Sequence, residues 1–131
     1  MKADYFLPGE KEGEVLMGSR DPQKIADYYR SRGVRNVIVK TGPKGAYCST
    51  EGKSFFSPTF QPDKIVDTVG AGDGFAVGVL SAVAEGLSLE EAVCRGNAIG
   101  TIQIMNVGDN EGLPTPEELK NFMKTHDRIK S

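Results

Sequence analysis

The sequence is poor in cysteine and histidine, and this scarcity limits the zinc sites that it could build. It contains two cysteines, Cys48 and Cys94, which are not in a CxxC spacing, and a single histidine, His126. These three residues cannot complete a standard zinc site by themselves. We therefore expect two reduced, buried thiols in a cytoplasmic protein.

Long apolar runs and clusters of positive charge are also absent from the sequence. No apolar run reaches the roughly 20 residues that a membrane-spanning helix needs. The first residues, MKADYFLPGEKEGE, do not have the pattern of a signal peptide. The formal net charge is −2 and no basic stripe is present. We therefore expect neither a membrane nor a nucleic acid as the partner.

What the sequence does contain is typical of one soluble α/β domain: 131 residues, 38% apolar and 26% charged. ADYFL (3–7) has the pattern of a short buried strand, and residues 10–18 predict a short helix. Asp21 and Pro22 are a typical helix start, with Gly33 expected as the C-cap of that helix. RNVIVKTG comes next as a β-branched strand. Such a strand–helix–strand unit implies a parallel sheet.

The rest of the sequence predicts a hairpin followed only by helices. GAYCST and KSFFSP alternate like strands on either side of Glu51–Gly52, a plausible hairpin turn. Helices are expected over about 70–84, from Ser88 to about Asn106, and from Thr115 to Asp127, the last two opening with capping boxes. The predicted fold is α/β with a helical C-terminal half.

The segment DTVGAGDGF leads through Gly70, Ala71 and Gly72 into one of these helices. Unpaired backbone N–H groups at a helix N-terminus bind anions, phosphate above all, and glycines let the backbone approach the ligand. Asp73 would lie in the first helical turn, where a general base could take a proton from an attacking hydroxyl. The alternative is an ordinary helix start, where an aspartate is favoured electrostatically.

Three competing assignments of this sequence can be set aside. The Walker A pattern GxxxxGK[ST] does not occur, and GxGxxG would require a glycine where Phe75 stands. A hydrolase is not indicated either, because His126 lies far along the chain from any candidate serine.

DTVGAGDGF with its apolar continuation closely resembles the C-terminal signature of the ribokinase-like (PfkB-type) carbohydrate kinases. VIVKTGPKGAY is similar to the nucleotide strand and glycine turn of that family, and GNAIG to the helix that borders the adenine pocket. GDNEGLPTPEEL most resembles the 2-keto-3-deoxygluconate kinase branch. The resemblance covers nearly the whole chain. It implies the C-terminal half of a ribokinase-like three-layer fold, with a parallel sheet, an antiparallel hairpin and flanking helices.

The resemblance implies a role for several residues. Asp73 would be the catalytic base that deprotonates the primary hydroxyl of the sugar, and would also bind that substrate. The backbone amides of Gly70, Ala71 and Gly72, with that of Asp73, would form an anion hole for the transferring phosphoryl group. Contacts to ATP would come from Lys40, Thr41, Gly42, Lys44, Gly45, Asn97 and Ala98.

Two further carboxylates match positions of the family. Asp109 would contact the sugar acid, with an ordinary turn aspartate as the alternative. Glu12 would help organise Mg²⁺, which accompanies ATP, although Gly9 stands where the family motif N-x-x-E has its asparagine. The alternative for Glu12 is a solvated helix glutamate. Plainer alternatives also exist for the predicted ATP contacts. Residues 40–45 could be an ordinary turn with exposed lysines, and Asn97 and Ala98 could belong to a helix-packing face of small residues.

The implied activity is ATP-dependent phosphorylation of a sugar or sugar acid, with 2-keto-3-deoxygluconate as the best candidate and with ATP and Mg²⁺ as cofactors. Members of the family are longer, so residues 1–131 are expected to form a single C-terminal, nucleotide-binding portion without the N-terminal substrate and lid portion. Such a portion would expose a sheet edge and an apolar helix face. We therefore expect self-association or pairing with the N-terminal half, and little activity alone. The alternative is a truncated, non-catalytic nucleotide-binding or assembly module.

Overall fold

The computed structural model describes residues 5–41, 44–63, 71–105 and 114–129, with the backbone alone at 10 and 71–73. Contacts within the chain divide it into two compact units, Met1–Ser57 and Pro58–Ser131. In the described parts of the chain, no helix is long and apolar enough to cross a bilayer.

The first unit is built on a mixed sheet with the strand order β1-β2-β3-β4. Its strands are β1 Tyr5–Phe6, β2 Asn36–Lys40, β3 Gly45–Thr50 and β4 Lys53–Pro58. β1 pairs with β2 in parallel, and β2 pairs with β3 antiparallel in a register that places Val37 opposite Ser49. Gly52 occupies the turn between β3 and β4 with a φ of 81°, a conformation that favours glycine. The predicted parallel pair and hairpin are both confirmed.

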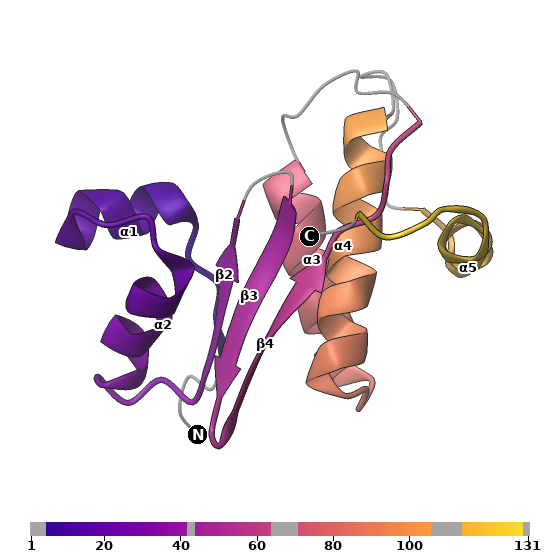
Figure 1. The fold of residues 1–131 in the computed structure, drawn as a ribbon. Coiled ribbons are helices and arrows are strands. Elements are labelled where there is room, and N and C mark those ends of the chain that lie inside the picture. Colours follow the sequence, from indigo (N-terminus) through magenta and orange to yellow (C-terminus); the bar gives the residue numbers. More distant parts are fainter. Residues whose placement is uncertain (1–4, 42–43, 64–70, 106–113, 130–131) are drawn as a thin grey trace. The chain divides into compact units, whose positions relative to one another are not determined.

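Two helices of the first unit, α1 Glu10–Met17 and α2 Pro22–Arg30, lie beside β2 (Figure 1). Ile25 and Ala26 of α2 form a fully buried cluster with Val37 and Val39 of β2. Gly13 lets α1 approach this cluster, because a Cβ there would collide with the side chain of Ile25. The core of this unit is therefore made mainly by aliphatic side chains.

The end of α2 differs from the prediction. Ser31 is the C-cap, and its N–H donates to the backbone oxygen of Asp27 over 2.9 Å. Gly33 comes two residues later with a φ of 99°, and its N–H donates to the backbone oxygen of Arg30 over 3.1 Å. The prediction of Gly33 as the C-cap was wrong, since the last helical hydrogen bond closes before it.

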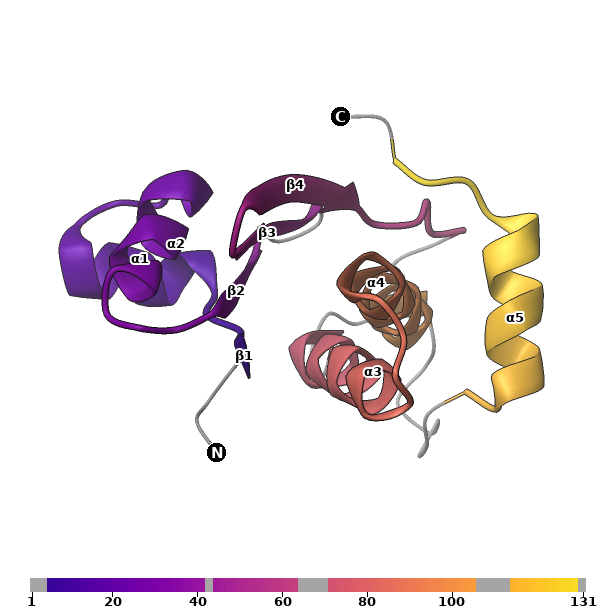
Figure 2. The same ribbon diagram turned by 90° about the horizontal axis from the view of Figure 1, so that it is seen from below.

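The second unit contains three helices, α3 Ala71–Ala84, α4 Leu89–Met105 and α5 Pro116–Thr125. α3 and α4 are joined by a short connection and lie side by side in both views (Figures 1 and 2). Capping boxes begin α4 and α5 as predicted: the Ser88 hydroxyl accepts from the N–H of Glu91, and Thr115 and Glu118 pair in the same way.

Glycines allow the close approach of α3 and α4. A Cβ on Gly96 would lie 2.7 Å from Val79 Cγ2 and 2.8 Å from the backbone oxygen of Phe75. A Cβ on Gly78 would lie 2.8 Å from the Cα of Gly96. Real Cβ atoms essentially never come this close to other atoms. Gly96, in the segment that resembles the adenine-bordering helix, is thus required by helix packing.

The two cysteines do not form a disulfide bond. Cys48 is fully buried in β3, whereas Cys94 in α4 is half-buried. Burial raises the pKa of the Cys94 thiol, and the nearby Arg128 guanidinium lowers it to a smaller extent. The burial predicted for both cysteines is therefore observed for Cys48 and only in part for Cys94.

Candidate functional site

The described part of the glycine-aspartate turn is the first turn of α3. The helix begins at Ala71, so the backbones of Ala71, Gly72 and Asp73 form its first turn, as predicted to within one residue. The first N–H groups of a helix have no intrahelical partner and lie at the positive end of its dipole, which is suited to an anion. Gly70 and Asp109 lie outside the described residues.

The segment that precedes this turn, residues 58–63, is held against α4; we call it the lead-in segment. The hydroxyls of Thr59 and Thr101 are 2.8 Å apart, and the Thr59 hydroxyl also donates to the backbone oxygen of Asn97 over 3.2 Å. The Asn97 side chain donates to the backbone oxygen of Pro58 over 3.4 Å, and the Thr101 hydroxyl to that of Phe60 over 3.4 Å.

Asn97 and Ala98, two predicted ATP contacts, lie on this packing face of α4. Asn97 is 1% exposed, and Ala98 is fully buried in a cluster with Phe60 and Phe122. Their described contacts are those of the helix-packing alternative. A contact of either residue with ATP stays a prediction.

The predicted ATP-binding turn after β2 belongs to the first unit. Lys40 ends β2, and its N–H donates to the backbone oxygen of Pro8 over 3.0 Å. The N–H and the hydroxyl of Thr41 both donate to the backbone oxygen of Gly45, over 2.9 and 3.0 Å. Thr41 is therefore buried and closes the turn, whereas Lys44 is exposed. Gly42 lies outside the described residues.

Glu12, the predicted magnesium residue, caps α1. Its Oε1 accepts a hydrogen bond of 2.6 Å from the N–H of Gly9, and its side chain is exposed. Within the residues that the structure describes, no group of three or more His, Cys, Asp or Glu side chains could hold a metal ion. Mg²⁺ commonly binds through one or two carboxylates, phosphates and water. A magnesium role of Glu12 stays a prediction.

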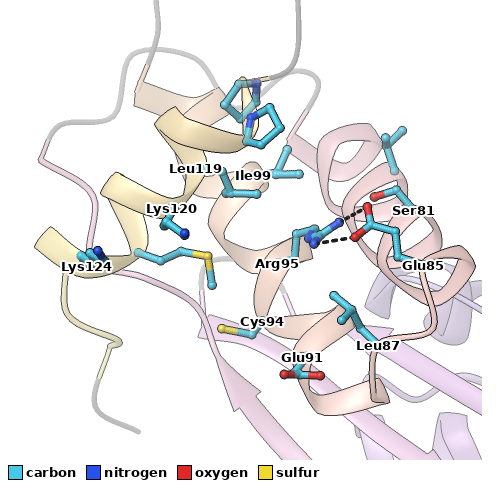
Figure 3. A pocket seen from close by; sticks show the side chains of 14 residues that line it. Ser81, Glu85, Leu87, Glu91, Cys94, Arg95, Ile99, Leu119, Lys120 and Lys124 are labelled. Carbon is cyan, nitrogen blue, oxygen red and sulfur yellow. Dashed lines mark hydrogen bonds and ion pairs between the residues drawn. The ribbon is translucent and has the colours of Figure 1, made fainter.

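A groove of about 720 Å³ lies between α3, α4 and α5 (Figure 3). Apolar residues such as Ile99 and Leu119 line it together with charged residues such as Lys120. Arg95 of α4 reaches Glu85 through two hydrogen bonds of 2.9 and 3.2 Å, and these lower the pKa of the Glu85 carboxyl. No sequence motif pointed to this groove, because its walls come from three separate helices.

The comparisons with known proteins identify the family. A family model of pfkB carbohydrate kinases matches residues 1–116. The chain belongs to the pfkB family of carbohydrate kinases. The 2-dehydro-3-deoxygluconokinase of Bacillus subtilis is 51% identical over 121 residues, which cover 92% of this chain and 37% of that enzyme. The ribokinase of Haemophilus influenzae is 32% identical over 126 residues, 92% of this chain and 41% of that enzyme.

Solved structures of pfkB kinases agree with the fold of this pfkB chain. A ribokinase from Thermotoga maritima has a TM-score of 0.82 at 36% identity, over 93% of this chain and 42% of that one. A putative ribokinase II from E. coli, solved with ATP and Mg²⁺, has a TM-score of 0.83 at 28% identity, over 94% of this chain and 40% of that one. The predicted family resemblance and fold class are confirmed. This pfkB chain spans less than half the length of these relatives.

Proposed function

We propose that this chain is the nucleotide-binding portion of a kinase that transfers a phosphoryl group from ATP to the primary hydroxyl of 2-keto-3-deoxygluconate. The observation that carries the proposal is its 51% identity to the 2-dehydro-3-deoxygluconokinase of Bacillus subtilis over 92% of the chain. Identity to the ribokinase of Haemophilus influenzae over the same share of the chain is 32%. The difference favours the sugar acid over ribose.

In this proposal Asp73 is the catalytic base. Its carboxylate takes the proton of the sugar hydroxyl while the hydroxyl oxygen forms a bond to the γ-phosphorus. The bond from that phosphorus to the bridging oxygen breaks, and ADP leaves with the electron pair. The first-turn amides at Gly70, Ala71 and Gly72 stabilise the charge of the transferring group, supported by the observed start of α3 at Ala71.

The nucleotide and the sugar acid contact further residues of the chain. ATP, bound as its magnesium complex, supplies the phosphoryl group. The glycine turn over residues 40–45 approaches the nucleotide, and Lys40 or Lys44 offsets phosphate charge. Asn97 and Ala98 border the adenine, Asp109 contacts the sugar acid, and Glu12 helps to organise the magnesium.

Replacement of Asp73 tests the proposed chemistry in the complete kinase that carries this chain. Asp73→Asn should lower kcat for 2-keto-3-deoxygluconate by about a thousand-fold, because general-base catalysis is lost. ATP affinity, measured by calorimetry, should be retained. The matched control is Asp21→Asn, another helix-start aspartate, where asparagine caps equally well. An Asp73→Asn enzyme with wild-type turnover would refute the role of Asp73.

We also propose that the chain works with a further portion of polypeptide, in a cytoplasmic protein. Large apolar side chains are exposed in both units, among them Val15 at 88% and Leu16 at 53% on α1, and Val77 at 43% and Leu80 at 49% on α3. Such surfaces favour association with the N-terminal half of a kinase or with a second copy. The isolated chain should sediment as an oligomer and show little turnover. A monomer with full kinase activity would contradict this proposal.

A further inference from the structure

The lead-in segment is held on two opposite sides, and α4 contacts it on only one of them. Its other edge pairs with residues 126–129, which come after α5 and which we call the C-terminal tail (Figures 1 and 2). Phe60 and Arg128 form an antiparallel bridge. The N–H of Ile129 donates to the backbone oxygen of Thr59, and the N–H of Gln61 to that of Asp127, each over 2.7 Å.

Side chains of the tail add to these backbone bonds. Arg128 Nε donates to the backbone oxygen of Pro58 over 2.6 Å, and its guanidinium lies 5.1 Å from the centre of the Phe60 ring. His126 Nε2 lies 3.0 Å from Asp63 Oδ2, while the His126 ring stacks on Phe122 at 3.9 Å. The tail therefore contacts the lead-in segment from its first residue to its last.

The lead-in segment runs along the chain towards the proposed catalytic turn. Asp73 lies ten residues after Asp63, at the start of α3. α3 is fixed on α4 through the close approach of Gly78 and Gly96, and the lead-in segment is fixed on α4 through Thr59 and Thr101. The lead-in segment, which precedes residues 64–70, and α3, which follows them, are therefore both anchored to α4.

We propose that the C-terminal tail, through His126 and Arg128, positions the first turn of α3 for phosphoryl transfer. This inference rests on the proposed function for its catalytic consequence. Phosphoryl transfer depends mainly on positioning and on charge stabilisation, and a misplacement of about 1 Å can cost about a hundred-fold in rate. His126 and Arg128 are thus positioning residues that act through the lead-in segment.

The first test is amide hydrogen exchange of the 131-residue chain, which does not depend on any kinase activity. The double variant His126→Phe and Arg128→Met keeps the ring stack and the apolar stem but removes the contacts to Asp63 and Pro58. It also removes the contacts of His126 Nδ1 with the end of α5 and of the Arg128 guanidinium with the Phe60 ring. Exchange in residues 58–63 and at the first intrahelical amides of α3, residues 75–77, should become about ten-fold faster, as expected for the loss of two or three hydrogen bonds. Exchange in α3 from Gly78 onward and in α4 should not change.

The control is Lys124→Met, which removes an exposed cation from the last turn of α5. It should leave all these rates unchanged, and His126→Gln, which keeps a donor towards Asp63, should restore part of the protection. Faster exchange confined to residues 58–63 would overturn the proposal, because the tail would then not influence α3. Equal acceleration throughout the second unit would overturn it as well, since the tail would then be a general stabiliser.

The second test uses the complete kinase. The double variant should lower kcat about ten-fold and change KM for magnesium-ATP less than about two-fold, because His126 and Arg128 bond to Asp63 and Pro58, neither of which is a proposed nucleotide contact. A wild-type enzyme without activity would refute the proposed function, and the exchange data would still decide the inference. An active enzyme whose variant keeps the wild-type kcat would refute the inference alone.

Discussion

The α2–β2 contact of the first unit and the α3–α4 contact of the second unit are packed in opposite ways. In the first unit, branched aliphatic side chains such as Ile25 and Val37 fill the space between α2 and β2. In the second unit, the absence of side chains at Gly78 and Gly96 lets α3 and α4 approach closely. The α2–β2 contact should therefore be sensitive to the removal of volume, and the α3–α4 contact to its addition.

The largest effect is expected where volume is removed from the first unit. Ile25 is fully buried, so Ile25→Ala should lower the free energy of unfolding by about 3 kcal/mol, through lost burial and the cavity that remains. Chemical denaturation measures this change. Val15→Ala is the matched control, because Val15 is 88% exposed and its truncation should cost almost nothing. Equal losses in the two variants would contradict the proposed core.

Added volume should have a somewhat smaller effect in the second unit. Gly96→Ala should lower the free energy of unfolding by about 2 kcal/mol, although alanine favours a helix, because the new methyl group collides with Phe75 and Val79. Gly9→Ala serves as the control, since its nearest atom would be Glu12 Oε1 at 3.9 Å. That variant should lose only about 0.5 kcal/mol, from a poorer helix cap. A stabilised Gly96→Ala protein would show that the helices can separate without cost.

The smallest effect is expected at the surface ion pair of the second unit. Hydrogen bonds from Arg95 lower the pKa of the Glu85 carboxyl below its usual value of 4.5. A lowered pKa in the folded state means that the pair stabilises the protein above pH 4.5 and that this contribution is lost as the pH falls through the lowered value.

Wild-type protein should therefore have a slightly higher Tm than Glu85→Gln at neutral pH, and this difference should vanish in acid. Added salt should reduce it, because the Glu85 side chain is 57% exposed. Melting curves recorded across this pH range measure the difference. Glu51→Gln, in the hairpin turn of the first unit, is the control variant for this difference in Tm. A difference that grows in acid would have the wrong sign for the Glu85–Arg95 pair.

Local signals in the sequence predicted most helix boundaries. Asp21 caps α2, and the pairs Ser88–Glu91 and Thr115–Glu118 begin α4 and α5, because a cap needs only residues within one turn of each other. The C-cap of α2 was placed incorrectly at Gly33. A glycine near the end of a helix shows where a positive φ is possible, but the last hydrogen bond, made by Ser31, decides where the helix ends.

In the candidate site, as for the helix boundaries, the local features could be predicted from the sequence and the long-range contacts could not. The start of α3 at the glycine-aspartate turn was evident from a short motif. The contact of His126 with Asp63 was not, because it joins residues 63 positions apart and no motif contains both. Asn97 shows the intermediate case: its helix was predicted, but its contact with Pro58 was not.

The sequence by itself determined the family, the α/β class and the helix start that carries Asp73, because these depend on short-range patterns and motifs. Only the tertiary structure decided why Gly96 is a glycine, which residues Asn97 contacts, and which segment the C-terminal tail holds. Each of these depends on atoms that approach through space from separate parts of the chain. Such contacts result from how the elements pack, and no single stretch of sequence encodes them.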